Sequence, residues 1–173
     1  MPIVVFNGVA ALLLIVLQSN FVSAFHITAF CINFSVISAC ALSAMNAPFA
    51  GSVFSMLLIG AFADSMSSGP PGLYHLLCML AYFALAALAL RVRSQRAIFI
   101  VVVAALTCAA FDLLYGMILA IIYPESTILQ AIPSVLWRNA IATAIFTPPY
   151  FWLISKANAI WLIRSQSGLR RKF

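Results

Sequence analysis

The sequence predicts an all-α integral membrane protein, a single bundle of about six transmembrane helices. Hydrophobic residues make up 65% of the 173 residues and charged residues only 7%, whereas a soluble domain carries roughly 25% charged residues. The mean hydropathy is +1.14. The apolar residues run continuously instead of alternating in strands of ~10 residues, which favours helices over a β-barrel. At about 20 residues per crossing, the chain allows roughly six helices with short loops.

The first three helices are expected over about residues 3–22, 27–45 and 48–63. The first is apolar apart from a few polar positions, among them Asn7 and Gln18. The second carries small residues at four-residue spacing, beginning with Ser35, which predicts close packing within the bundle or against a partner.

The last three helices are expected over about residues 72–90, 97–123 and 134–160. The fifth is long enough to require tilt. The sixth begins near Pro133, and it should bend where Pro148 and its neighbouring proline each remove a backbone donor. All six helices, and the whole chain 1–173, belong to one membrane domain.

The basic residues set the predicted topology. The loop RVRSQR at residues 91–96 is the only strongly basic internal loop, so it should lie in the cytoplasm, as should the basic tail two crossings later. Counting back places the N-terminus inside, and the 64–72 turn and the loop with Glu125 outside. Because the basic clusters border apolar segments, the net charge of +6 indicates contact with membrane lipids and not with nucleic acid.

Asp112 is the acidic residue placed deepest in the membrane, on the order of 16 Å inside the outer end of the fifth helix. An unpaired carboxylate at that depth is costly. Arg138, early in the sixth helix, is the expected partner, in an ion pair or a hydrogen-bond network between helices. A proton or substrate relay and a contact to a partner subunit are the alternatives.

The segment at residues 57–77, LLIGAFADSMSSGPPGLYHLL, is the most distinctive part of the chain. It is an apolar helix followed by a Ser/Gly/Pro turn and a second apolar helix. Prolines such as Pro71 suit a helix start, where a missing N–H costs little. Gly69 and Gly72 allow a tight reversal of the chain.

Asp64 ends the first of these two helices. We expect its carboxylate to cap the start of the next helix, to accept hydrogen bonds from the turn, or to pair with His75 or Arg138. A patch that binds a partner protein is the alternative interpretation of this corner.

Motifs for catalysis are missing from the sequence. Neither membrane aspartate has a GxGD-like setting, and there is no GxSxG, HExxH or phosphate-binding loop. The four cysteines lie in apolar stretches without a CxxC pair, which is typical of small buried side chains and not of a metal site. We therefore expect a protein that is not an enzyme and has no cofactor or metal.

The 57–77 segment resembles the MreD family, the small inner-membrane subunits of the bacterial rod-shape machinery. Members share an apolar helix ending in Gly-x-x-x-Asp, a short Gly/Pro turn, and a Gly-Leu opening to the next helix. The matching residues here are Gly60 and Asp64, followed by Gly69, Pro70, Pro71, Gly72, Leu73 and His75.

Three further features fit the same family, namely the RVRSQR loop, Asn139 with the later Pro148, and Gln18-Ser19 near the end of the first helix. The chain departs from the pattern in the second helix. There, Cys31-Ile32-Asn33 stands near the place where members often carry a Pro-Asp pair.

The resemblance implies a non-catalytic subunit of the bacterial inner membrane that binds MreC. Through MreC it would link to MreB and to the RodA and PBP2 pair that builds sidewall peptidoglycan. It also implies a fold similar to the S components of energy-coupling-factor transporters, which supplies the alternative of a vitamin-binding transport subunit. S components commonly carry an Ala-x-x-x-Ala docking motif in the first helix, and VVFNGVAALLLIVLQ has none, which counts against transport.

Overall fold

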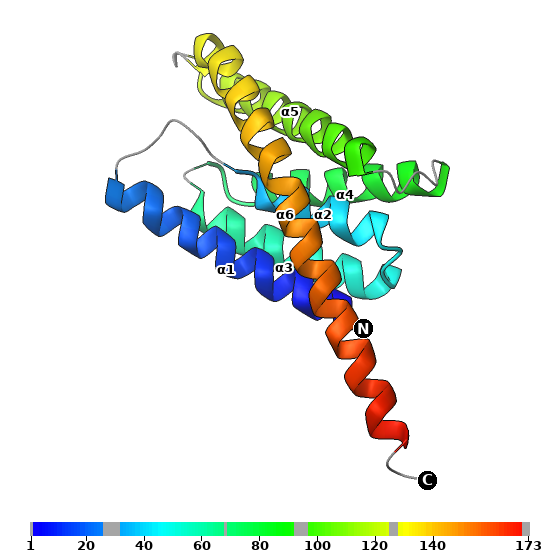
Figure 1. Ribbon diagram of the computed structural model, residues 1–173. Coiled ribbons are helices and arrows are strands. Elements are labelled where there is room, and N and C mark those ends of the chain that lie inside the picture. Colours follow the sequence, from blue (N-terminus) through cyan, green and yellow to red (C-terminus); the bar gives the residue numbers. More distant parts are fainter. Residues whose placement is uncertain (1, 26–31, 68, 92–96, 125–127, 171–173) are drawn as a thin grey trace.

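The fold is all-helical in the computed structural model, which describes residues 2–25, 32–67, 69–91, 97–124 and 128–170 (Figure 1). Across these ranges the chain forms six helices and no strand. They are α1 Pro2–Phe25, α2 Phe34–Ala44, α3 Phe49–Met66, α4 Leu73–Arg91, α5 Ala97–Ile122 and α6 Ile128–Arg170. The predicted all-helical class is therefore confirmed.

Four of the helices are long and apolar enough to cross a membrane. The qualifying windows are Ile3–Asn20 in α1, Phe49–Met66 in α3, Leu73–Arg91 in α4 and Ile98–Ile122 in α5. Their mean hydropathies lie between 1.5 and 2.4, and helices of this length and composition suggest a membrane protein. The bounds of α3, α4 and α5 lie within about three residues of those predicted from the sequence.

The second helix differs from its prediction. The helix α2 has 11 residues, about 16 Å, or roughly half the thickness of a bilayer core. It begins at Phe34 because Asn33 is its N-cap, with the Asn33 side chain accepting from the Val36 N–H at 3.2 Å. The expected range 27–45 is therefore too long, and its residues 27–31 lie outside the described part of the chain.

This short helix is the centre of the bundle. All residues from Phe34 to Leu42 are buried, and α2 contacts each of the other five helices. A helix that is buried on every side fits an apolar sequence without a polar face. Its small residues Ser35 and Ala39 are buried inside the chain, so at these positions the stripe serves packing within the bundle.

Two hydrophobic clusters meet at α2. The larger joins α1 to α5 around Met56, Ile59 and Tyr82. The smaller joins α1 and α2 to the C-terminal half of α6 around Ile37 and Ile154. Both clusters include residues of α1 and α2, so these two helices hold the rest of the bundle together.

A buried polar contact joins the same three helices as the smaller cluster. Asn7 on α1 and Ser38 on α2 are fully buried, and the Asn7 amide donates to the Ser38 hydroxyl. The Tyr150 hydroxyl of α6 donates to the Asn7 side-chain oxygen at 3.0 Å. Each group in an apolar interior thereby finds a partner, as its burial requires.

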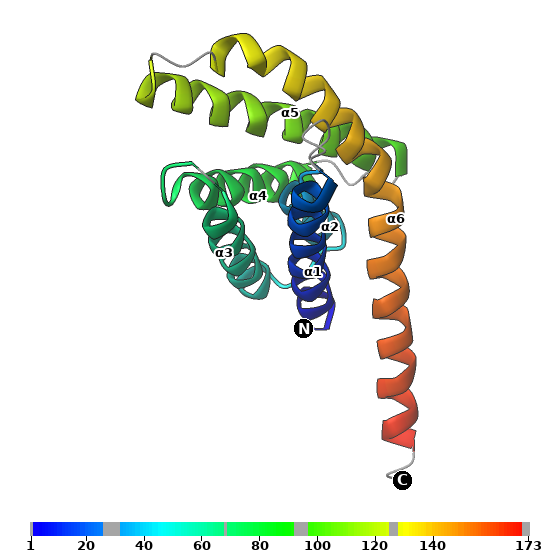
Figure 2. The same ribbon diagram turned by 90° about the vertical axis from the view of Figure 1, so that its left-hand side faces the viewer.

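The helix α6 runs from Ile128 to Arg170, so the predicted start near residue 134 is wrong. Pro133 lies inside the helix, where it removes one intrahelical hydrogen bond without ending it. Figure 2 shows that the first half of α6 lies along α5 and that the helix then turns away about midway along its length. Pro148 and Pro149 lie within the helix, and paired prolines are a sufficient cause of such a bend.

The ends of the helices gather at two opposite ends of the bundle. In Figure 1 the C-terminal ends of α1 and α5 and the start of α6 lie at the left and upper left, whereas the N-terminus and the C-terminal end of α6 lie at the lower right. The predicted topology would make the first of these the outer end and the second the inner end. Most of the basic residues that define the prediction, at 92–96 and in the tail, lie outside the residues whose side chains are described.

Candidate functional site

The corner between α3 and α4 is held by one carboxylate. Asp64 lies in the last turn of α3, and its Oδ2 accepts from the Gly72 N–H at 2.6 Å while its Oδ1 accepts from the Tyr74 N–H at 3.0 Å. These two N–H groups lie at the start of α4, where a helix has no backbone partner for them. Asp64 is thus the cap of the next helix, which is one of the roles expected for it.

The turn before α4 depends on two glycines and a proline. Gly72 has φ +87°, in the region that residues with a side chain rarely adopt. Pro71 is exposed in the turn. At Gly69, a Cβ atom would collide with the Tyr115 hydroxyl of α5, so the glycine leaves room for that side chain.

The two helices of the corner touch closely at Gly60. A Cβ placed there would lie 3.2 Å from the His75 Nδ1 and 3.3 Å from the His75 Cα, so Gly60 permits the approach of α4 to α3. His75 packs on α3 by this contact. The expected pairing of Asp64 with His75 or Arg138 is not seen, because both Asp64 oxygens face backbone N–H groups.

Asp112 has a different partner from the one predicted. Its Oδ2 accepts from the Asn139 side-chain amide at 3.0 Å and lies 3.9 Å from the Cys108 Sγ. Arg138 instead donates from Nε to the Ser134 carbonyl oxygen of its own helix, at 2.6 Å. The expected hydrogen-bond network between α5 and α6 therefore exists, but Asn139 and not Arg138 supplies the contact.

This contact is part of a polar network at the N-terminus of α2. The Asn33 N–H donates to the Thr143 hydroxyl of α6 at 3.2 Å, and that hydroxyl lies 3.3 Å from the Cys108 Sγ. The Tyr74 hydroxyl of α4 donates weakly to the Asn33 side-chain oxygen at 3.4 Å. Four helices are joined in this way through side chains that sit in apolar surroundings.

Gln18 on α1 faces the non-helical backbone that precedes α2. In the amide orientation that satisfies both groups, its nitrogen donates to the Ile32 carbonyl oxygen at 2.8 Å and its oxygen accepts from the Ile32 N–H at 3.2 Å. Non-helical backbone at membrane depth requires such partners, or a cavity with water.

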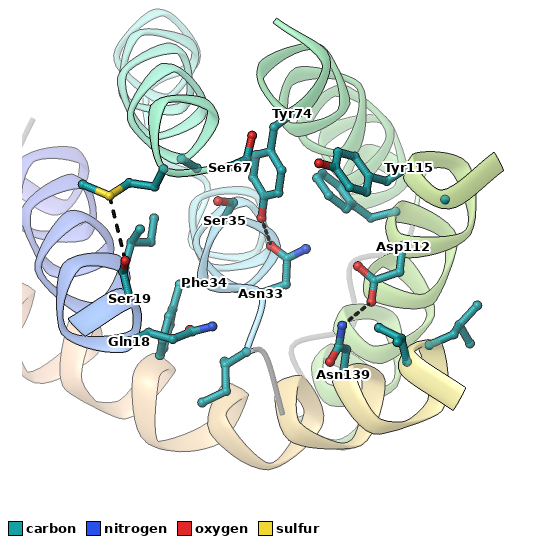
Figure 3. Close-up of a pocket in the computed structure, with 18 of the residues that line it drawn as sticks. Gln18, Ser19, Asn33, Phe34, Ser35, Ser67, Tyr74, Asp112, Tyr115 and Asn139 are labelled. Carbon is teal, nitrogen blue, oxygen red and sulfur yellow. Dashed lines mark hydrogen bonds between the residues drawn. The ribbon is translucent and has the colours of Figure 1, made fainter. Parts of the chain in front are cut away.

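These groups surround a cavity of about 570 Å³. Its lining comes from the C-terminal ends of α1 and α3, the second half of α5, and the N-terminal ends of α2, α4 and α6. All six helices therefore contribute, and each does so at the same end of the bundle. Figure 3 shows Asn33, Tyr74, Asp112 and Asn139 around this space.

The cavity has the size and composition of a small-molecule site, since such sites occupy about 300–1,000 Å³ and are mostly apolar with a few converging polar groups. Four aromatic side chains line it, and three of them form a cluster. The Tyr74 ring centroid lies 4.9 Å from that of Phe111 and 6.0 Å from that of Tyr115. Among the lining residues that the structure describes, Asp112 alone carries a formal charge.

The sequence prediction identified Asp112 and Asn139 as site candidates but missed Asn33, Ser35 and Tyr74. The available signal was weak: Asn33 is a polar residue within the apolar run predicted as the second helix. That such a residue ends a half-length helix inside the bundle depends on contacts with α4 and α6, which lie far away in the sequence.

The described cysteines are buried side chains. Cys40, Cys78 and Cys108 are buried free thiols, in agreement with the prediction that they are small apolar side chains. Within the described ranges, no three His, Cys, Asp or Glu residues lie close enough together to hold a metal ion.

Comparisons with known proteins give no further assignment. No protein-family model, no curated protein and no solved structure matches this chain.

Proposed function

We propose that this protein is a non-catalytic subunit of the bacterial inner membrane that binds MreC, in the manner of the MreD family. Its role would be to position MreC, and through it MreB, RodA and PBP2, for sidewall peptidoglycan synthesis. In this proposal the chain crosses the membrane six times as one bundle, α2 is a buried half-length helix within the second crossing, and both termini lie in the cytoplasm.

The observation that carries the proposal is the corner at residues 60–75. The residues that resemble the family motif act together as one physical unit. Gly60 brings α4 against α3, Asp64 caps α4, and Gly72 supplies the positive φ that the reversal needs. A sequence pattern whose members contact one another is better support than scattered matches of the same number.

Capture of partners from membranes tests the proposal. The full chain with an affinity tag is purified from mildly solubilised membranes, and the proteins that accompany it are identified. We expect MreC. Recovery of an energising transmembrane subunit with ATPases, and no MreC, would contradict the scaffold function.

A matched pair of variants links the capture to the corner. Asp64→Ala removes the cap of α4, so less MreC should be recovered per mole of chain. Ser65→Ala changes the next residue, whose hydroxyl donates to the Phe62 carbonyl oxygen of its own helix and to no other described residue, and it should recover MreC as the unmodified chain does. Equal recovery with both variants would argue against the corner as the basis of the interaction.

A small-molecule-binding subunit, similar to the S components of energy-coupling-factor transporters, is the second candidate. The cavity of about 570 Å³ favours it, because a scaffold protein has no need of a ligand-sized space. Gene neighbourhood separates the two candidates: an adjacent MreC-type gene supports the scaffold, and adjacent ATPase genes support transport.

A further inference from the structure

We propose that the cavity between the helix ends binds an organic cation, an ammonium group attached to an apolar body. The inference rests on the cavity alone and not on capture of MreC, so it holds for a scaffold and for a transport subunit. Its starting point is Asp112, the one formally charged residue among the described residues that line the space.

Asp112 offers an unused acceptor to the cavity. Its Oδ2 is occupied by the Asn139 amide, whereas its Oδ1 has no hydrogen-bond partner among the described residues. Figure 3 shows the Asp112 carboxyl group facing the open space between Asn33 and Tyr115. A carboxylate in apolar surroundings is costly unless a cation or a donor faces it, and a bound ammonium group would supply both.

The described charges around the cavity do not oppose binding of a cation. Arg138 is held by the Ser134 carbonyl oxygen and does not line the cavity. Three helix N-termini and three helix C-terminal segments face the same space, so their dipoles oppose one another and give no strong net field. The carboxylate therefore determines the sign of the ligand charge.

The other residues that line the cavity fit the apolar body and the ammonium group of such a ligand. Phe34, Tyr74, Phe111 and Tyr115 provide aromatic surface, which attracts cations as well as apolar groups. Ser35 also lines the cavity, with its hydroxyl oxygen buried in the wall.

The cavity has an opening through which a ligand can enter. Ser19 and Met66 line it from the ends of α1 and α3, and both are exposed. Their side chains lie together, with the Ser19 hydroxyl 4.0 Å from the Met66 sulfur (Figure 3).

Three probes of similar shape test the sign of the charge. Tryptamine is a cation, tryptophol is its neutral analogue, and indole-3-propionate is an anion. Binding of each to the full chain in lipid nanodiscs is measured by equilibrium dialysis, with empty nanodiscs as the blank for partition into lipid. We expect tryptamine to bind about tenfold more tightly than tryptophol, as a charge-assisted hydrogen bond would give, and indole-3-propionate to bind most weakly.

Two variants place the binding in the cavity. Asp112→Asn keeps the shape and removes the charge, so it should erase the preference for tryptamine while changing tryptophol binding by less than about twofold. Leu136→Trp fills the cavity from α6 and should weaken binding of tryptamine and tryptophol alike. Its control is Ile141→Trp, at an exposed position on the same helix, which should bind all three probes as the unmodified chain does.

Three results would overturn the inference. They are tryptophol binding as tightly as tryptamine, a preference for tryptamine that survives Asp112→Asn, and no specific binding of any probe. If Asp112→Asn does not fold, the pair Leu136→Trp and Ile141→Trp decides the location, and equal tryptamine binding by the two would refute it. Capture of MreC is a separate measurement, so the failure of one proposal does not affect the other.

Discussion

Removal of the Asp64 carboxylate is the sharpest test of the corner between α3 and α4. In Asp64→Ala the N–H groups of Gly72 and Tyr74 lose the acceptors that lie 2.6 and 3.0 Å away. A hydrogen bond to a charged group is worth about 1.5–3 kcal/mol. Because Gly72 is exposed and Tyr74 is half-buried, water replaces part of this loss. We expect the free energy of unfolding to fall by about 2 kcal/mol, the upper end for loss of a helix cap.

The assay is unfolding of the purified chain in mixed micelles by titration with SDS, followed by loss of helical circular dichroism. Two further variants calibrate it. Asp64→Asn keeps one side-chain acceptor and should lose about half as much stability. Ser65→Ala should stay within about 0.5 kcal/mol of the unmodified chain, as a surface change without a partner in another element does.

The order of the three variants is the result that matters. If Asp64→Ala were no less stable than Ser65→Ala, the carboxylate would not hold the corner, and the argument from its two short contacts would fail. An Asp64→Asn variant as unstable as Asp64→Ala would show that the charge, and not the number of acceptors, provides the stabilisation.

The remaining predictions concern the interior of the bundle. Asn139→Ala should lower the free energy of unfolding by about 1.5–3 kcal/mol because Asp112 loses its amide donor, whereas Arg138→Ala should cost less than about 1 kcal/mol. The same SDS titration measures both variants. A larger loss of stability in Arg138→Ala than in Asn139→Ala would support the ion pair between Asp112 and Arg138 that the sequence predicted. Tyr150→Phe should cost about 1–2 kcal/mol because the buried Asn7 oxygen loses its donor, and an unchanged unfolding midpoint would contradict that role.

The sequence predicted the local features well, because their causes lie close together in the chain. The composition indicates a membrane protein, and the continuous apolar runs predicted the helical class. Of the six crossings predicted, four helices in the described residues are long and apolar enough to span a membrane. The cap at Asp64 was predictable for the same reason. The carboxylate and the N–H groups that it binds are only eight and ten residues apart, joined by a turn that proline and glycine define.

The position of α2 was not predictable from its own residues. An apolar run of that kind is compatible with a full crossing, and Asn33, a residue type favoured at helix N-caps, is only a weak signal for a shorter helix. Asn33 caps the helix start through the nearby Val36 N–H, and Asn33 itself is held by Thr143 and Tyr74, which are 110 and 41 residues away in the chain. Only the packed bundle brings these groups together.

The partner of Asp112 shows the same division between sequence and tertiary structure. The sequence by itself determined that an acid deep in α5 needs a polar partner on α6, because an unpaired carboxylate in apolar surroundings is too costly. Tertiary structure decided which residue of α6 is that partner. Adjacent helical residues point about 100° apart, so the rotation of α6 against α5 turns Asn139 toward the carboxylate and leaves Arg138 on its own helix. The cavity at that end exists for the same reason, since it depends on how six helix ends meet.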